Sequence, residues 1–254
     1  MLTATAVRRR NWTCLAAPPS PAASVLFFPF AGGSVVGLRT LSRLLPPGCA
    51  AHCFRPPRLD GEERTMSLDT ITASVSVELG EYARLPRVLV GVSLGALLAL
   101  GVASRTPGAA STCVLVAQSP AGLARLHPGP VSDGAIRALL ASGGAVDERA
   151  LADADVVGEL VRRVRADFSI VGEGDLPAAR ERCRADVSYV CGDADPLVPV
   201  GELAKWHGFT EGAVNGSVVR GGHFAAFDPD NSGPVAAAFS VAVRGAMVKS
   251  GREK

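Results

Sequence analysis

Apolar residues in this chain gather in short continuous runs that alternate with longer amphipathic stretches. Continuous runs lie at 24–28, 88–92 and 112–117, and further strand-like stretches lie at 50–54, 186–191 and 216–219. An apolar run without polar alternation is typical of a strand that is covered on both faces. Between two of these runs, Leu68, Ile71, Val75, Leu79 and Tyr82 recur at helical spacing, which predicts an amphipathic helix on a sheet. The alternation predicts a mostly parallel, doubly wound α/β sheet flanked by helices.

The alternation stops between about 120 and 178, where helical pieces at 136–141 and 150–164 replace the strands. Glycines at 143–144 and 172–174 separate these pieces from their surroundings. Helices inserted into such a sheet commonly cover a ligand site, although they can also be extra helices on the outside of the domain. We expect a helical lid of about 120–178 within a single domain of residues 1–254, with a possible edge strand near Trp12.

The composition is that of an ordinary globular protein, with 48% apolar residues, 20% charged residues and a net charge of +2. This balance favours neither nucleic acid nor a membrane surface as a partner, and no apolar run is long enough to span a bilayer. The Arg8-Arg9-Arg10 sequence is not followed by the apolar segment of a secretory signal. The six cysteines include no Cys-x-x-Cys pair, so we expect reduced, buried thiols in a cytoplasmic protein, with no metal site and no protein-bound cofactor.

The candidate chemistry centres on residues 86–100, where a strand-like run leads through Gly91-Val92-Ser93-Leu94-Gly95 into an apolar helix. Strand, Gly-x-Ser-x-Gly and helix in this order are the context of a nucleophile elbow. The turn is so tight that side chains at 91 and 95 would clash, which explains both glycines. The pattern predicts Ser93 as a nucleophile and the Leu94 N–H as a donor to an oxyanion.

A serine hydroxyl needs a base to take its proton and a carboxylate to orient that base. His223 follows the last predicted strand and two glycines, so it is the predicted base; His52, His127 and His207 have packed or exposed positions. Asp193 and Asp195 both lie in the turn after residues 186–191, and we favour Asp195, which precedes Pro196.

The second oxyanion donor is expected from the loop after the run at 24–28, since glycines there let the backbone approach a ligand. We favour the Ala31 N–H in Phe30-Ala31-Gly32-Gly33, although an ordinary glycine turn before a helix would have the same sequence.

As an ordered set, several motifs between residues 24 and 245 resemble those of type II thioesterases, the stand-alone α/β-hydrolases that accompany polyketide synthases and non-ribosomal peptide synthetases. The resemblance rests on Phe28-Pro29-Phe30-Ala31-Gly32-Gly33, the elbow of 91–96, Arg165-Ala166-Asp167-Phe168, Gly192-x-x-Asp195-Pro196, Trp206 and Gly221-Gly222-His223-Phe224.

The resemblance implies an α/β-hydrolase fold, a triad of Ser93, Asp195 and His223, and a lid that shapes the acyl chamber. It also implies hydrolysis of acyl groups from the phosphopantetheine thioester of an acyl or peptidyl carrier protein, as editing or release in antibiotic biosynthesis. The chain departs from the family at Val92, where His is usual, at Pro56-Pro57-Arg58, where Pro-Gly-Arg is usual, and at 170–174, where aromatic residues are usual.

Other functions share this site. The same acyl-enzyme could pass its acyl group to another acceptor, as in an acyltransferase or cyclase, and a plain carboxylesterase would use the same residues. A binding protein on a retired hydrolase fold would have no reason to keep all three residue types in order. Arginines at 162, 163 and 165, or at 55, 58 and 64, could form a basic surface for an acidic carrier protein, or simply a solvated face.

Overall fold

The computed structural model describes residues 11–33, 35–55, 67–79, 85–120, 132–141, 146, 148–168 and 182–251. The predictions at Tyr82, His127, Arg58, Arg64, the Pro56-Pro57-Arg58 loop, and the glycines of 143–144 and 172–174 lie outside these ranges.

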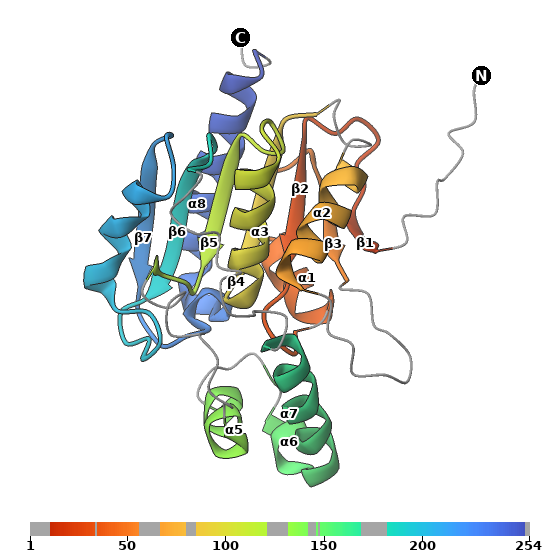
Figure 1. Ribbon diagram of the computed structural model, residues 1–254, viewed down its shortest axis with the longest axis vertical. Coiled ribbons are helices and arrows are strands. Elements are labelled where there is room, and N and C mark those ends of the chain that lie inside the picture. Colours follow the sequence, from red (N-terminus) through yellow and green to blue (C-terminus); the bar gives the residue numbers. More distant parts are fainter. Residues whose placement is uncertain are drawn as a thin grey trace, which may run out of the picture.

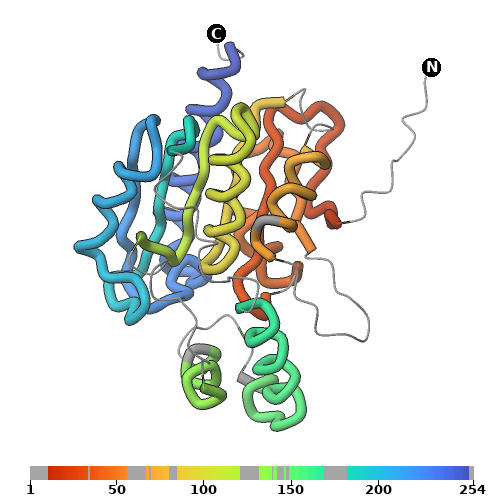
Figure 2. Tube along the Cα trace, in the orientation of Figure 1, coloured from red at the N-terminus to blue at the C-terminus, as the bar shows by residue number. Residues whose placement is uncertain are grey.

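The described residues form a sheet of seven strands in the order β1-β3-β2-β4-β5-β6-β7. Edge strand β1 pairs antiparallel with β3, and every other neighbouring pair is parallel. Figure 2 shows the early strands on one side of the sheet and the late strands on the other. The prediction of a mostly parallel α/β sheet is confirmed. The strands are β1 (Trp12–Ala16), β2 (Ala23–Phe28), β3 (Cys49–Phe54), β4 (Arg87–Val92), β5 (Thr112–Val116), β6 (Asp186–Gly192) and β7 (Val214–Val219).

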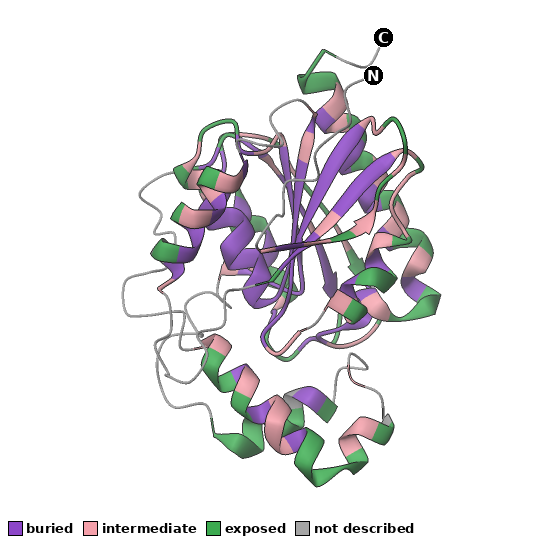
Figure 3. Cartoon of the chain, turned by 90° about the vertical axis from the view of Figure 1, so that its right-hand side faces the viewer, coloured by how far each residue is buried: buried purple, intermediate pink, exposed green. Residues whose placement is uncertain are grey.

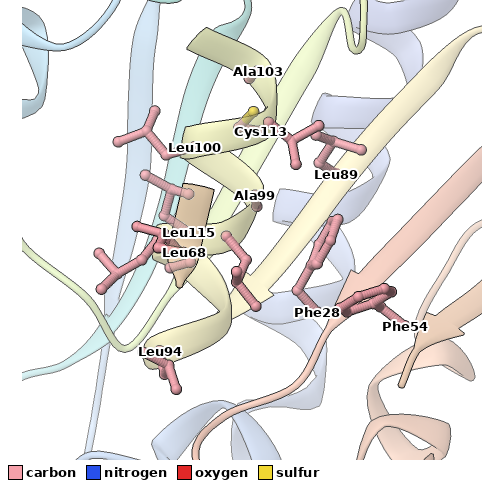
Figure 4. Packing of buried hydrophobic residues seen from close by; sticks show 14 of the residues in the cluster. Phe28, Phe54, Leu68, Leu89, Leu94, Ala99, Leu100, Ala103, Cys113 and Leu115 are labelled. Carbon is pink, nitrogen blue, oxygen red and sulfur yellow. The ribbon is translucent and has the colours of Figure 1, made fainter. Parts of the chain in front are cut away.

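Helices cover both faces of the sheet (Figure 1). One apolar cluster joins the sheet to α2 (Leu68–Leu79) and α3 (Leu94–Arg105), and a second joins it to α1 (Val35–Ser42) and α8 (Ser232–Lys249). Helix α3 is buried on all sides from Leu94 to Ala103, which explains its almost wholly apolar sequence. Figure 4 shows Leu100 of this helix together with Leu68 of α2 and Leu115 of β5. Of the helices that the structure describes, none has both the length and the hydropathy needed to cross a membrane.

Between β5 and β6 lie α5 (Asp133–Ala141), α6 (Glu148–Ala152) and α7 (Ala154–Phe168), which we call the insertion helices. They lie beyond one end of the sheet in Figure 1, and many of their residues are exposed in Figure 3. The prediction of one helix over 150–164 was wrong. The chain breaks at Asp153, whose carboxylate accepts hydrogen bonds from the N–H groups of Asp155 and Val156 and so begins a new helix.

Two smaller differences concern the last third of the chain. The helix expected at 201–207 is the 3₁₀ helix η2 (Val200–Gly208), and strand β7 begins at Val214, two residues before the apolar run. Short 3₁₀ turns η3 (Ala225–Phe227) and η4 (Pro229–Asn231) lead into α8.

Candidate active site

Ser93 lies on a sharp turn between β4 and α3, with φ of 50° and ψ of −115°. A non-glycine residue with positive φ is strained, and such strain persists only where the surroundings enforce it. Here the Ser93 N–H donates to the Val116 carbonyl at 2.8 Å. A Cβ at Gly91 would lie 2.3 Å from the Gly95 carbonyl oxygen, and one at Gly95 would lie 2.1 Å from the Phe28 carbonyl oxygen. Both glycines are therefore required by close backbone approach.

The structure brings together the three side chains that the sequence singled out. His223 Nε2 lies 3.0 Å from Ser93 Oγ, and His223 Nδ1 lies 2.8 Å from Asp195 Oδ2. Because an ionised carboxylate can only accept, the proton lies on Nδ1, which leaves Nε2 to accept from the serine hydroxyl. All three residues are buried, so the surrounding water competes little for these hydrogen bonds.

The choice between the two aspartates follows from the turns that hold them. Asp195 bonds to His223 and also accepts from the Leu197 N–H at 2.8 Å, whereas Asp193 accepts from the Gly221 N–H at 2.8 Å. The Ala194 N–H in turn donates to the Gly221 carbonyl at 2.9 Å. Asp193 therefore joins the loop after β6 to the loop after β7, and this places His223 beside Asp195.

The two predicted oxyanion donors belong to the loops that follow β2 and β4. In the described part of the chain, neither the Leu94 nor the Ala31 N–H has an acceptor. The Gly33 N–H donates to the Phe30 carbonyl at 2.8 Å, and Gly32 has φ of +73°. This is the pattern of a type II turn with Ala31 and Gly32 at its centre. We call residues 30–33 the oxyanion loop.

Two polar side chains that the sequence reasoning missed support the segments that carry Ser93 and His223. Gln118 follows β5, is buried, and donates from Nε2 to the Ser93 carbonyl at 3.3 Å. Asn231 donates to the carbonyls of Arg220 and Ala225 on either side of His223, at 2.9 and 2.8 Å. The position of Gln118 at the carboxyl end of a strand was a usable signal, because Asp195 and His223 also follow strands at that edge.

Other candidate groups near the site have packing positions. Val92, where the family usually has His, is fully buried in the apolar cluster that faces α8. Cys191 donates from Sγ to the Gln118 carbonyl at 3.5 Å, and burial raises the pKa of its thiol to about 12. It therefore stays protonated near neutral pH and is a poor nucleophile. His52 lies half-buried in β3, and His207 is exposed at the end of η2.

The arginines of α7 have acidic neighbours. Arg162 and Arg163 pair with Glu159, and Arg165 pairs with Asp133 of α5. Except for Arg163, these residues also line a hollow of about 530 Å³ between α5 and α7, and Ser93 is not among its lining residues. No group of three or more His, Cys, Asp or Glu side chains that could hold a metal ion occurs in the described ranges.

The sheet order, the elbow after a central strand and the flanking helices define an α/β-hydrolase fold. A family model described as "Thioesterase domain" matches residues 23–240. The chain therefore belongs to the thioesterase domain family.

Named relatives agree with this membership. The chain is 28% identical over 215 residues to the phenyloxazoline synthase MbtB of Mycobacterium tuberculosis, covering 79% of this chain and 15% of that protein. It is 26% identical over 212 residues to a probable cadicidin biosynthesis thioesterase of Streptomyces griseus, covering 80% of this chain and 58% of that one. The chain thus spans less than two thirds of the length of these relatives.

Similar solved structures support the fold. The type II thioesterase BorB from the borrelidin biosynthetic cluster has a TM-score of 0.71 at 22% identity, covering 90% of this chain and 97% of that one. RedJ, a thioesterase from the prodiginine pathway of Streptomyces coelicolor, has a TM-score of 0.69 at 24% identity, covering 87% and 88%.

Proposed function

We propose that the chain is a serine thioesterase in which Ser93 is the nucleophile, His223 the general base and acid, and Asp195 the residue that orients the histidine. The observation that carries the proposal is the hydrogen-bonded series Asp195–His223–Ser93 at the end of the sheet in a member of the thioesterase family. Because all three side chains are buried, a charge that develops there is governed mainly by the protein groups around it.

The proposed reaction begins when Ser93 Oγ attacks the thioester carbonyl carbon while His223 Nε2 takes the hydroxyl proton. The N–H groups of Leu94 and Ala31 would hold the oxygen that becomes negative. As the C–S bond breaks, His223 returns the proton to the thiol, which leaves an acyl ester on Ser93. Water then attacks this ester with His223 again as base, and the carboxylic acid departs with Ser93 restored.

For the substrate we propose acyl groups on the phosphopantetheine thiol of an acyl or peptidyl carrier protein, removed as editing or release. The support is the kind of relative that the chain resembles, including a thioesterase of cadicidin biosynthesis and the type II thioesterase BorB. The pantetheine belongs to the substrate, so the chain itself needs no cofactor in this reaction. The free cysteines, five of them buried, suit a cytoplasmic enzyme.

Transfer to an amine, alcohol or carbon nucleophile is the main alternative, because it uses the same acyl-enzyme. The two outcomes differ only in which acceptor reaches the ester on Ser93. They are distinguished by the product, since hydrolysis gives a free acid.

The test is intact-protein mass spectrometry of a carrier protein loaded with acetyl, propionyl or longer acyl groups. We expect the wild-type chain to remove the acyl mass and form the free acid, and Ser93→Ala to be inert. Asp195→Asn should lower kcat by about 10³- to 10⁴-fold, because the histidine loses its orienting carboxylate. Asp193→Asn is the matched control: it removes the same charge two residues away but keeps an acceptor oxygen for the Gly221 N–H, so the contact between the two loops is retained and most activity should remain.

Unloading of the carrier without free acid would replace hydrolysis by transfer or cyclisation. A carrier that stays loaded at every chain length would contradict the thioesterase proposal, and small esters would then be the substrates to examine.

A further inference from the structure

The end of α7 touches the oxyanion loop, although the two segments are far apart in the sequence. Asp167 Oδ2 accepts a hydrogen bond from the Gly32 N–H at 2.7 Å. One turn earlier in α7, Val164 is so close that a Cβ added at Gly32 would lie 2.6 Å from its Cγ2 atom. At Gly32 the oxyanion loop therefore makes both a hydrogen bond and close apolar packing with α7.

The hydrogen bond acts on the peptide unit that decides the type of turn. Types I and II differ by a flip of the central peptide, which here joins Ala31 to Gly32. In the observed turn the N–H of this peptide points to Asp167. A flipped peptide would present the Ala31 carbonyl oxygen to the carboxylate instead, and two acceptors facing each other repel. Asp167 therefore stabilises the observed orientation.

This orientation matters for the proposed chemistry because Ala31 is the first central residue of the turn. The peptide that is bonded to Asp167 shares the Cα atom of Ala31 with the peptide that carries the Ala31 N–H, so anchoring the first peptide limits how far the second can move. Asp167 bonds to the N–H of Gly32 and not to that of Ala31, so it does not compete with a substrate oxygen for the predicted donor.

We propose that Asp167 is a positioning residue for the oxyanion hole: it holds the loop in its competent turn, so that the hole is complete only while α7 lies against Gly32. The inference rests on the proposed thioesterase function. It assigns to the insertion helices a part in the chemical step, beyond any part in enclosing the acyl group.

The neighbouring aromatic contacts show how the loop is held on its other side. Phe30 packs against Phe224 with ring centroids 4.8 Å apart, and Phe224 follows the predicted base His223. The loop is therefore fixed to the His223 segment by apolar packing and to α7 by a hydrogen bond. Removing Asp167 deletes the hydrogen bond to α7 and leaves both the Phe224 contact and the close packing of Val164 in place.

The experiment compares the wild type with Asp167→Ala, Asp167→Asn and Asp153→Ala. Asp153→Ala is the matched control, because it removes the cap at the other end of α7 and leaves Gly32 untouched. The readouts are kcat and KM for a short acyl pantetheine thioester, the rate of Ser93 labelling by a fluorophosphonate, and the thermal midpoint. Both reactions place a polarised oxygen in the proposed hole.

Loss of a whole oxyanion donor costs about 10²- to 10³-fold in kcat, so a misplaced donor in Asp167→Ala should cost roughly tenfold. The same loss is expected in fluorophosphonate labelling, with KM within about threefold of wild type because ground-state binding is unchanged. Asp167→Asn keeps an acceptor oxygen but no charge, so it should recover to within about threefold of wild type. Asp153→Ala should keep the wild-type kcat even if its thermal midpoint falls.

Three results would overturn the inference while leaving the thioesterase proposal intact. They are wild-type kcat in Asp167→Ala, an Asp153→Ala variant as slow as Asp167→Ala, and an Asp167→Asn variant, folded by its thermal midpoint, as slow as Asp167→Ala. A wild-type chain that neither hydrolyses the thioester nor reacts with the fluorophosphonate would instead overturn the proposed function.

Discussion

The sheet with its loops and the insertion helices are held together in different ways. Around Ser93 the backbone comes so close to itself that Gly91, Gly95 and Gly192 have no room for a Cβ. In the insertion, a Cβ at Gly158 in the middle of α7 would meet nothing within 4 Å. We call the sheet, its loops and the helices α1, α2, α3 and α8 the body. Its site is held by backbone contacts that leave no room for an added atom, whereas α7 buries Val157, Val161 and Val164 and exposes a face that carries ion pairs.

The difference separates a part of the molecule with a fixed geometry from a part whose position can adjust. Catalytic geometry must be held within fractions of an ångström, and backbone packing in a buried sheet achieves this. Under the proposed function the insertion helices would cover a substrate and would have to yield, and exposed charge pairs contribute little stability. The hydrogen bond between Asp167 and Gly32 links the insertion helices to the oxyanion loop of the sheet.

The largest expected effect in stability comes from adding one methyl group to the body. In Gly95→Ala the new Cβ would lie 2.1 Å from a backbone oxygen of Phe28, and that strand is buried and cannot yield. We expect a loss of at least about 3 kcal/mol in the free energy of unfolding, measured by urea denaturation. Gly233→Ala is the control, because a Cβ there would also meet nothing within 4 Å. A Gly95→Ala variant as stable as the wild type would contradict the account of the elbow.

The same substitution in the insertion should have the opposite sign. Alanine is favoured over glycine in a helix interior by about 1 kcal/mol, so Gly158→Ala should slow amide hydrogen exchange in α7 by roughly fivefold. If the insertion opens separately from the body, the global unfolding midpoint should stay unchanged. A rise in that midpoint would mean that the insertion and the body unfold together, and the contrast between them would be wrong.

The structure of the body could be predicted from the sequence more completely than that of the insertion helices. Buried strands such as β2, β4 and β5 carry continuous apolar runs, so they could be read from the chain, and Gly-x-Ser-x-Gly located the elbow. Strand β7 is mostly not buried and was predicted from its place in the alternation of strands and helices. The break at Asp153 was missed, because a capping aspartate inside an amphipathic stretch resembles an ordinary polar position. Residue spacing also does not say which side chain meets which loop 135 residues away, so the contact of Asp167 with Gly32 required the fold.

The smallest expected effect is on the reactivity of the cysteine thiols, which lie in the body and not in the insertion. All six cysteines lie outside 120–178, and five of them are buried. Burial raises the pKa of Cys53 and Cys191 to about 12, so at pH 8 both thiols stay protonated and react slowly. Exposed Cys14 should therefore react alone with a thiol reagent in the native protein, and all six should react after unfolding.

In dilute urea, α7 amides should exchange faster while the buried thiols stay protected, because the insertion opens before the sheet. Thiols that became reactive together with α7 exchange would show instead that the body opens with the insertion, and the division between a precise body and an adjustable cover would not hold.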